Sequence, residues 1–177
     1  GDITVTSVSD GSLMLPSNMV MDSLASDQLD ALQSEFDLGD KLTPPCNITL
    51  VQTADRTVLI DAGAGPEFMS SAGYVLDALD AAGVYPEDVT DVVFTHAHPD
   101  HIWGLVDDFD DLTFPEARYM IGRQEWDYWT DPNTVDTIGD ARTTFAVGAA
   151  RRLSRIEDQV IFFEDGEEIL PGIAARA

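Results

Sequence analysis

The stretch "FTHAHPDHIWG", residues 94–104, contains every histidine of this chain: His96, His98 and His101. Three imidazoles within six positions, interleaved with Asp100, form a dense group of nitrogen and oxygen donors. A lone histidine is usually a satisfied core or surface residue, but a group at this spacing is typical of a metal site. The absence of thiolates favours a catalytic transition-metal centre (zinc, manganese, iron or cobalt) over a closed structural one.

The spacing within this stretch predicts how the side chains point. In an extended segment side chains alternate, so His96 and His98 share one side and Ala97 points back into the core. A helix that begins directly afterwards would bring Asp100 and His101 toward the same pocket. We therefore expect the four donors to converge.

The residues upstream predict that this group lies at the end of a buried strand. "TDVVFT", residues 90–95, is a short apolar strand that leads straight into the histidines. "TVLIDAG", residues 57–63, is apolar on both faces until Asp61, as in a central strand that ends in a carboxylate. "SAGYVLDALDAAGV", residues 71–84, predicts a helix between the two strands. Strand, helix and strand in this order form a βαβ unit with its site at the carboxyl ends of the strands.

The rest of the chain predicts further elements of a single domain over 1–177. Polar and apolar residues alternate in 1–11 up to a turn at Asp10-Gly11, and Ser26 caps an amphipathic helix in a long loop over one face of the domain. The other predictions are a hairpin of 46–53 with 57–63, a strand in 112–122, helices over 123–129 and 139–156, and a hairpin over 159–170 that turns at Asp165-Gly166.

The composition excludes several classes of partner. Asp and Glu number 33 against nine Lys and Arg, so the formal charge is -24, which repels nucleic acid and anionic membrane surfaces. No apolar run approaches the roughly 18 residues of a membrane span, and no signal-peptide pattern opens the chain, so the compartment stays undefined. Cys46 is the single cysteine, and its apolar setting indicates a buried small hydrophobe.

Three stretches resemble one known family. "FTHAHPDH", residues 94–101, matches the H-x-H-x-D-H motif of the metallo-β-lactamase superfamily, and "VLIDAGAG", residues 58–65, resembles its upstream strand with a buried aspartate. "FPEARYMIGRQEWDYW", residues 114–129, is similar to the branch of methyl-parathion-hydrolase-like enzymes and quorum-quenching lactonases. The resemblance covers nearly the whole chain, and it implies an α/β fold, the αββα sandwich of two sheets with helices outside.

The resemblance also implies roles for the clustered residues. His96 and His98 would bind one metal ion, Asp100 and His101 a second, and Asp61 would orient the site from behind. The implied function is a metal-dependent hydrolase, with zinc as cofactor, that uses a metal-bound hydroxide on a small ester, lactone or phosphotriester. Asp100 would have the catalytic role of holding that hydroxide and carrying a proton. Glyoxalase-II-like thioesterase and β-lactamase chemistry stay open, whereas the acidity disfavours a nuclease.

One departure from the family pattern predicts an incomplete domain. The family carries further histidine and aspartate ligands downstream, but no histidine follows His101. We expect an N-terminal part of the domain, incomplete at its C-terminus, whose uncovered sheet pairs into a homo-oligomer. The alternative function is a truncated or degenerate domain that only binds metal or self-associates. Four acidic residues could replace the missing ligands, but we expect them to be solvated surface: Asp131, Asp136, Asp140 and Asp165.

Overall fold

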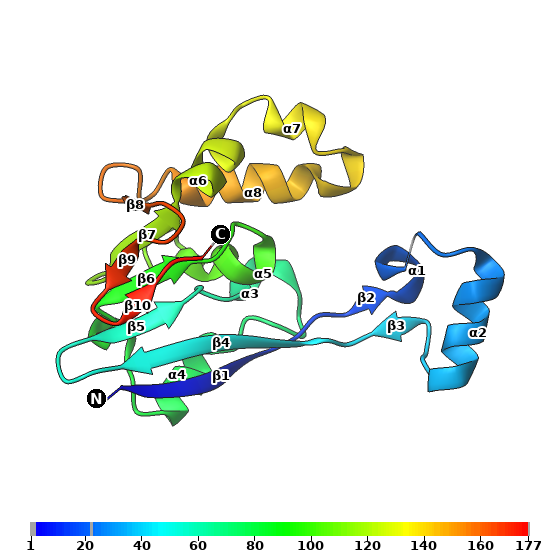
Figure 1. Cartoon of the computed structure of the whole chain (residues 1–177), viewed down its shortest axis with the longest axis horizontal. Coiled ribbons are helices and arrows are strands. Elements are labelled where there is room, and N and C mark those ends of the chain that lie inside the picture. Colours follow the sequence, from blue (N-terminus) through cyan, green and yellow to red (C-terminus); the bar gives the residue numbers. More distant parts are fainter. Residues whose placement is uncertain (1–2, 22, 177) are drawn as a thin grey trace.

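A mixed sheet of six strands is the centre of the computed structural model, which describes residues 3–21 and 23–176 (Figure 1). The strands lie in the order β1-β4-β5-β6-β7-β8; the first three pair antiparallel, and β5 to β8 run parallel. Their bounds are β1 Thr4–Ser12, β4 Pro45–Gln52, β5 Thr57–Ile60, β6 Asp91–Phe94, β7 Arg118–Gly122 and β8 Ile161–Phe163.

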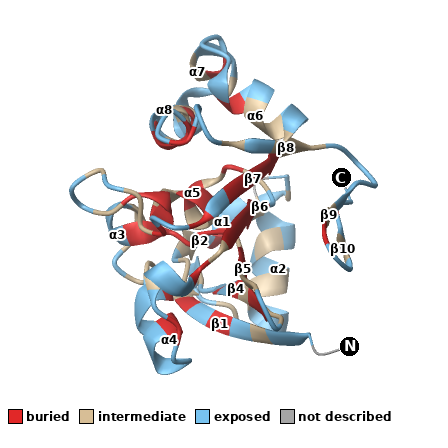
Figure 2. Ribbon diagram, turned by 90° about the vertical axis from the view of Figure 1, so that its left-hand side faces the viewer, coloured by how far each residue is buried: buried red, intermediate tan, exposed pale blue. Residues whose placement is uncertain are grey.

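The central strands are apolar on both sides because both faces of the sheet are covered there. All four residues of β6 are buried (Figure 2). On one face Leu59, Val92 and Phe94 pack in a core with helices. On the other face Val58 and Val93 pack under a small hairpin, β9 Glu168–Leu170 with β10 Ile173–Ala174. This double covering explains why the predicted strands around Asp61 and the histidines have no polar alternation.

The helices fill the connections between the strands. Val75 and Leu79 of α4 are buried against the sheet. Gly83, at φ 73°, follows the C-cap of this helix and stops it from continuing. Leu76, which the helical pattern places on the same face, is instead 43% exposed. No helix in the described ranges has the length and apolar character that crossing a membrane requires. The bounds are α3 Gly65–Phe68, α4 Val75–Ala81, α5 Pro99–Ile102, α6 Arg123–Thr130, α7 Thr134–Thr137 and α8 Thr143–Leu153, with short 3-10 turns at Pro86–Asp88 (η1), Trp103–Leu105 (η2) and Asp140–Arg142 (η3).

The segment between β1 and β4 projects from the sheet as an arm (Figure 1). It consists of β2 Leu15–Pro16, α1 Ser17–Val20, α2 Ser26–Phe36 and β3 Lys41–Leu42, with β2 and β3 paired antiparallel at its base. An amphipathic helix does form here, but the predicted cap and position are wrong, because Ser26 is the first residue of α2 and Ala25 holds the cap position. None of its residues is buried, because it lies at the end of the arm and not over a face of the domain.

The turn predicted at Asp10-Gly11 is wrong. β1 continues through both residues, and the register with β4 shifts between Ser9 and Gly11, which marks a bulge. The bulge turns the Asp10 carboxylate inward, where it accepts hydrogen bonds from the backbone N–H groups of Ala64 (2.7 Å) and Val75 (2.8 Å). A dipeptide typical of tight turns serves here to satisfy two buried donors. Of the predicted strand 1–11, Gly1 and Asp2 lie outside the described residues.

The hairpin predicted over 159–170 is also wrong. β8 pairs in parallel with β7, and β9 pairs with β10 and not with β8. The chain does turn at Gly166, which has φ 82°, but it then leaves the edge of the main sheet. The physical reason is burial, because this path lays Leu170 over the second face of the sheet.

Candidate metal centre

The histidine cluster lies where the sheet delivers the chain into α5. β6 ends at Phe94, and Pro99 occupies the first position of α5, where its missing N–H costs nothing. The rings of His96 and His98 have centroids 4.6 Å apart, and those of His96 and His101 are 4.0 Å apart. The three predicted imidazoles are therefore brought together, and Ala97 points inward with no exposed surface, as the alternation predicts.

A close backbone contact holds α5 and η2 against the loop that follows β5. The N–H of Ala62 donates to the carbonyl of His101 at 2.8 Å, and that of Gly104 donates to Gly63 at 2.9 Å. A Cβ atom at Gly104 would lie 2.1 Å from the carbonyl oxygen of Ala62. Glycine is thus required at position 104 for the histidine loop to reach Asp61.

Asp61 lies behind the cluster, as predicted, and is 5% exposed. Its Oδ1 accepts a hydrogen bond from the backbone N–H of Thr95 at 2.7 Å, and its Oδ2 accepts one from the Thr95 hydroxyl at 2.8 Å. Nδ1 of His101 lies 2.8 Å from the same Oδ2. Asp61 adopts a left-handed backbone conformation, with φ 70°, and the surrounding hydrogen bonds help to hold it there.

Asp100 and His101 form a close pair in front of Asp61. Nε2 of His101 lies 3.2 Å from Oδ2 of Asp100, so the imidazole has a carboxylate on each side. Burial alone would lower the pKa of His101, but its hydrogen bonds to Asp100 and Asp61 outweigh that and raise the pKa to about 10. Burial likewise opposes ionisation of Asp100, yet the hydrogen bond from His101 lowers the pKa of that carboxyl.

The pKa values of His96 and His98 are shifted down, in the opposite direction to that of His101. Burial lowers the pKa of both rings, and neighbouring histidines add to the effect. Both are therefore neutral at pH 7, which is the form of imidazole that binds metals.

The sequence did not single out Glu125, although it contacts the loop between the first two histidines. Its Oε2 accepts a hydrogen bond from the backbone N–H of Ala97 at 3.3 Å and one from Nε1 of Trp129 at 2.7 Å. Trp129 is 4% exposed, and its ring packs edge-on against His98 with centroids 5.6 Å apart. No local pattern predicts this contact, because α6 and the histidine loop are separated by a whole strand.

The donors fit a divalent transition metal by their chemistry. Neutral imidazoles and a carboxylate suit zinc and neighbouring transition metals. Nδ1 of His96 contacts the Thr95 hydroxyl and Nδ1 of His101 contacts the Asp61 carboxylate, as expected for metal ligands held in a fixed orientation. Across residues 3–21 and 23–176, however, no three His, Cys, Asp or Glu side chains stand ready in an arrangement that would hold an ion. Binding at this cluster would require the ring of His101 and the carboxylate of Asp100 to separate.

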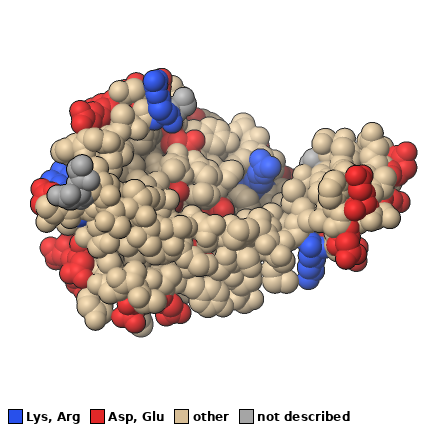
Figure 3. Space-filling view, turned by 60° about the horizontal axis from the view of Figure 1, so that its bottom comes forward, with Lys and Arg blue, Asp and Glu red and all other residues tan. Residues whose placement is uncertain are grey.

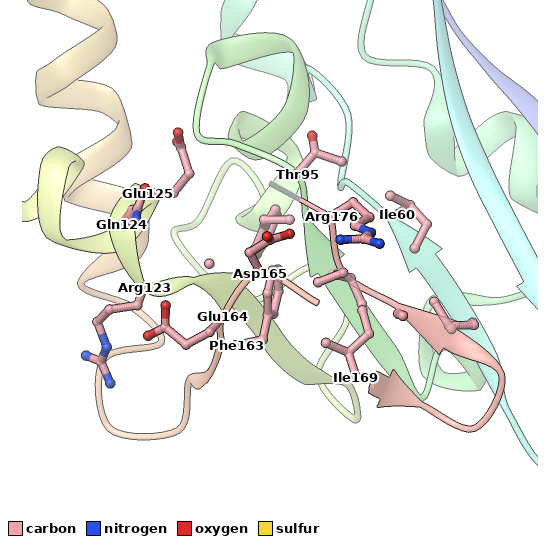
Figure 4. A pocket seen from close by; sticks show the side chains of 16 residues that line it. Ile60, Thr95, Arg123, Gln124, Glu125, Phe163, Glu164, Asp165, Ile169 and Arg176 are labelled. Atoms are coloured by element: carbon pink, nitrogen blue, oxygen red, sulfur yellow. The ribbon is translucent and has the colours of Figure 1, made fainter. Parts of the chain in front are cut away.

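A hollow of about 500 Å³ lies beside the cluster (Figure 4). Thr95 and Glu125 line it on one side, and apolar residues that include Phe163 and Ile169 line it on the other. Glu164 and Asp165 also border it, whereas the Arg123 side chain points away. The hollow joins a largely apolar wall to the polar edge of the cluster.

The comparisons with known proteins establish the family. Residues 43–174 match the model of the metallo-beta-lactamase superfamily, so the chain belongs to that superfamily. The fold class predicted from the sequence is confirmed, since the mixed sheet and its helices superpose on solved members of this fold. AidC, described as a dizinc quorum-quenching lactonase in complex with a product, matches over 97% of this chain with a TM-score of 0.84 and 25% identity. The hydrolase AbOPH matches over 96%, with a TM-score of 0.81 and 24% identity.

A curated relative has higher identity over a shorter region. Metallo-beta-lactamase domain-containing protein 1 of Mus musculus is 40% identical over 98 residues, which are 55% of this chain and 31% of that protein. The chain spans 61% of the AidC chain and 60% of the AbOPH chain. The superfamily and the dizinc lactonase AidC together suggest a divalent metal.

Proposed function

We propose that this chain carries the metal-binding end of a metal-dependent hydrolase that acts on a small ester, lactone or phosphotriester. The observation that carries the proposal is the convergence of His96, His98 and His101 in front of the buried carboxylate of Asp61. Family membership supports hydrolase chemistry at the level of the superfamily. The description of AidC as a dizinc lactonase supports the choice of metal and of substrate class.

Each donor has a proposed task. His96 and His98 hold one ion, Asp100 and His101 hold the second, and zinc is the expected metal, with manganese, iron and cobalt as alternatives. When bound, such ions activate water and polarise the carbonyl or phosphoryl oxygen under attack.

The protein groups themselves orient and move protons. Asp61 holds the ring of His101 through Nδ1, which leaves Nε2 facing Asp100. Asp100 is 23% exposed at its side chain, so it can reach a substrate at the mouth of the cluster and carry a proton to the leaving group. The apolar wall of the adjoining hollow gives a small organic substrate a place to bind.

The proposed partner is a small molecule and not a nucleic acid or a membrane. Figure 3 shows acidic side chains over several parts of one face and few basic ones, in line with the formal charge of -24. Such a field repels phosphate backbones. We also propose self-association into a homo-oligomer, supported by Val5 of β1 and by Ile3 just before it, which are 65% and 46% exposed. Light scattering measures it directly.

The experiment is a hydrolysis assay of the zinc-loaded chain on an acyl-homoserine lactone, an aryl ester and a phosphotriester. Turnover of at least one substrate is expected, with loss of turnover in Asp100→Asn, which should keep the ion held by His96 and His98 but hold the second ion more weakly. Asp108→Asn, a nearby exposed aspartate, is the matched control. Equal turnover in Asp100→Asn and in the parent chain would overturn the role of Asp100.

A second candidate function is a domain that binds metal or self-associates without turnover. It is favoured by the contact between Nε2 of His101 and the Asp100 carboxylate, which engages two of the proposed donors with each other. Stoichiometric zinc with no hydrolysis of any of the three substrates would support this candidate over the hydrolase.

A further inference from the structure

The Asp61 carboxylate is surrounded by hydrogen-bond donors. The backbone N–H of Thr95, the Thr95 hydroxyl and Nδ1 of His101 all lie within 3.0 Å of its oxygens. An ionised carboxylate can only accept hydrogen bonds, so each of these neighbours must supply a proton. The Thr95 hydroxyl, which has a single proton, therefore directs it at Asp61.

This direction determines what the Thr95 oxygen offers to His96. Oγ1 of Thr95 lies 3.0 Å from Nδ1 of His96. Because the only hydroxyl proton is engaged with Asp61, the oxygen faces the imidazole as an acceptor, and Nδ1 of His96 must carry the proton. In a neutral imidazole protonated at Nδ1, the free lone pair is on Nε2.

We propose that Thr95 is a positioning residue that links Asp61 to His96, so that one buried carboxylate holds Nδ1 of both His96 and His101 as donors. His96 is held through the threonine hydroxyl and His101 directly. The two imidazoles belong to different proposed ion sites, and in both a single hydrogen-bonded chain engages Nδ1. Nε2 is then the nitrogen left for an ion, directly in His96 and, in His101, after its contact with Asp100 is broken. The use of Nε2 by a metal rests on the proposed function, but the tautomer of His96 does not.

His98 provides an internal contrast. Within the described part of the chain its ring nitrogens form no hydrogen bond, and the ring is held by the edge-on contact with Trp129. The hydrogen bonds of Thr95 therefore do not determine which ring nitrogen of His98 is protonated.

The test uses nitrogen-15 NMR of the imidazole rings in the metal-free 177-residue chain at pH 8. The chain has only three histidines, so three ring patterns are expected, and single His→Gln variants assign them. The variants are Thr95→Val, which keeps the shape but removes the hydroxyl, and Thr95→Ser, which retains it. Both keep the backbone N–H that bonds to Asp61, and amide spectra check that they fold.

The expected result is a His96 ring protonated at Nδ1 in the parent chain and in Thr95→Ser. In Thr95→Val the ring should shift toward the Nε2-protonated form, while the pattern of His98 stays unchanged. A His96 ring protonated at Nε2 in the parent chain, or no change in Thr95→Val, would overturn the proposal.

Zinc affinity, measured by competition with a chromophoric chelator, separates this proposal from the proposed function. Thr95→Val should bind zinc about 10-fold more weakly, and Thr95→Ser should stay close to the parent chain. If the parent chain binds no zinc but the His96 tautomer follows Thr95, the metal function fails and the link stands. If zinc binds and the tautomer ignores Thr95→Val, the link fails and the metal function stands.

Discussion

Asp91 and Asp61 lie at opposite ends of the paired parallel strands β6 and β5, and both are nearly or fully buried, at 0% and 5% exposed. Asp91 is paired with two guanidinium groups, those of Arg56 and Arg118. Asp61 faces a threonine and a histidine. Arginine gives a permanent countercharge, whereas histidine leaves a second ring nitrogen available for other chemistry.

The two ends of this strand pair therefore have different roles: Asp91 serves stability and Asp61 serves the proposed site. At the amino end, a buried charge is neutralised by side chains that always stay charged, and nothing is left to react. At the carboxyl end, the same kind of charge is used to orient imidazoles. Experiments at the two ends should therefore give different results, and the three substitutions and one alkylation experiment below run from the largest expected effect to the smallest.

Asp91→Asn should lower the free energy of unfolding by about 3 kcal/mol, the low end for breaking a buried pair. The loss is at the low end because the side chains of Arg56 and Arg118 are 35% and 44% exposed and can turn to water. Urea unfolding measures it, and Asp30→Asn on the exposed arm helix should change stability by less than about 0.5 kcal/mol. Zinc affinity should not change; if it fell strongly, the two ends would not be separate.

The reactivity of the Cys46 thiol measures the electrostatic environment at the carboxyl end of β5 and β6. Burial, followed by the charges of Asp100 and Asp10, raises the pKa of its thiol from 9.0 to about 11. At pH 8 the thiolate fraction is then about 100-fold lower than in an unfolded chain, since each pKa unit is a factor of ten. Alkylation by iodoacetamide should be slow, rise with pH up to about 11, and become fast in urea. Rapid alkylation of the folded chain at pH 8 would contradict this setting.

Asp61→Asn should weaken zinc binding by about 10- to 100-fold, because His96 and His101 lose the carboxylate that orients them. The amide keeps the shape of the side chain, so the cost to stability should be smaller than for Asp91→Asn. Chelator competition and urea unfolding on the same two variants give the comparison directly. A variant that binds zinc like the parent chain but unfolds easily would assign Asp61 a structural role only.

Glu125→Gln should have the smallest effect, a loss of zinc affinity of up to about 10-fold. Both hydrogen bonds, from Ala97 and Trp129, go to one oxygen of Glu125, and an amide oxygen can accept both, but more weakly than a carboxylate, so the loop between His96 and His98 is loosened but not released. Asp127→Asn, on the exposed side of the same helix, is the control for charge. An equal loss in both variants would trace the effect to net charge and not to position.

The histidine cluster and its place at the end of a buried strand were predictable because both depend on local pattern. The continuous apolar run of β6 and the motif spacing are visible in a few consecutive residues. Asp61 was found for the same reason, as the carboxylate that ends an apolar strand. The sandwich family followed from the motif, although the metal-ligand roles of these residues stay predictions.

The elements that were missed depend on contacts between distant residues. The hydroxyl of Thr95 matters only because Asp61, 34 positions earlier, reaches it across the sheet. The local pattern around Asp10 predicts a turn because its partners, the N–H groups of Ala64 and Val75, lie more than 50 positions away in the sequence. The pairing of β9 with β10 likewise followed from the need to cover Val93, which no local pattern contains.

The most direct test of the central claim is the metal content per chain, measured by elemental mass spectrometry after purification without added metal. The comparison is between the parent chain and the double variant His96→Ala with His98→Ala. We predict one to two equivalents of a divalent metal, with zinc foremost, in the parent chain and a near-complete loss in the double variant. Near-zero metal in the parent chain, even after reloading with zinc, would contradict the account.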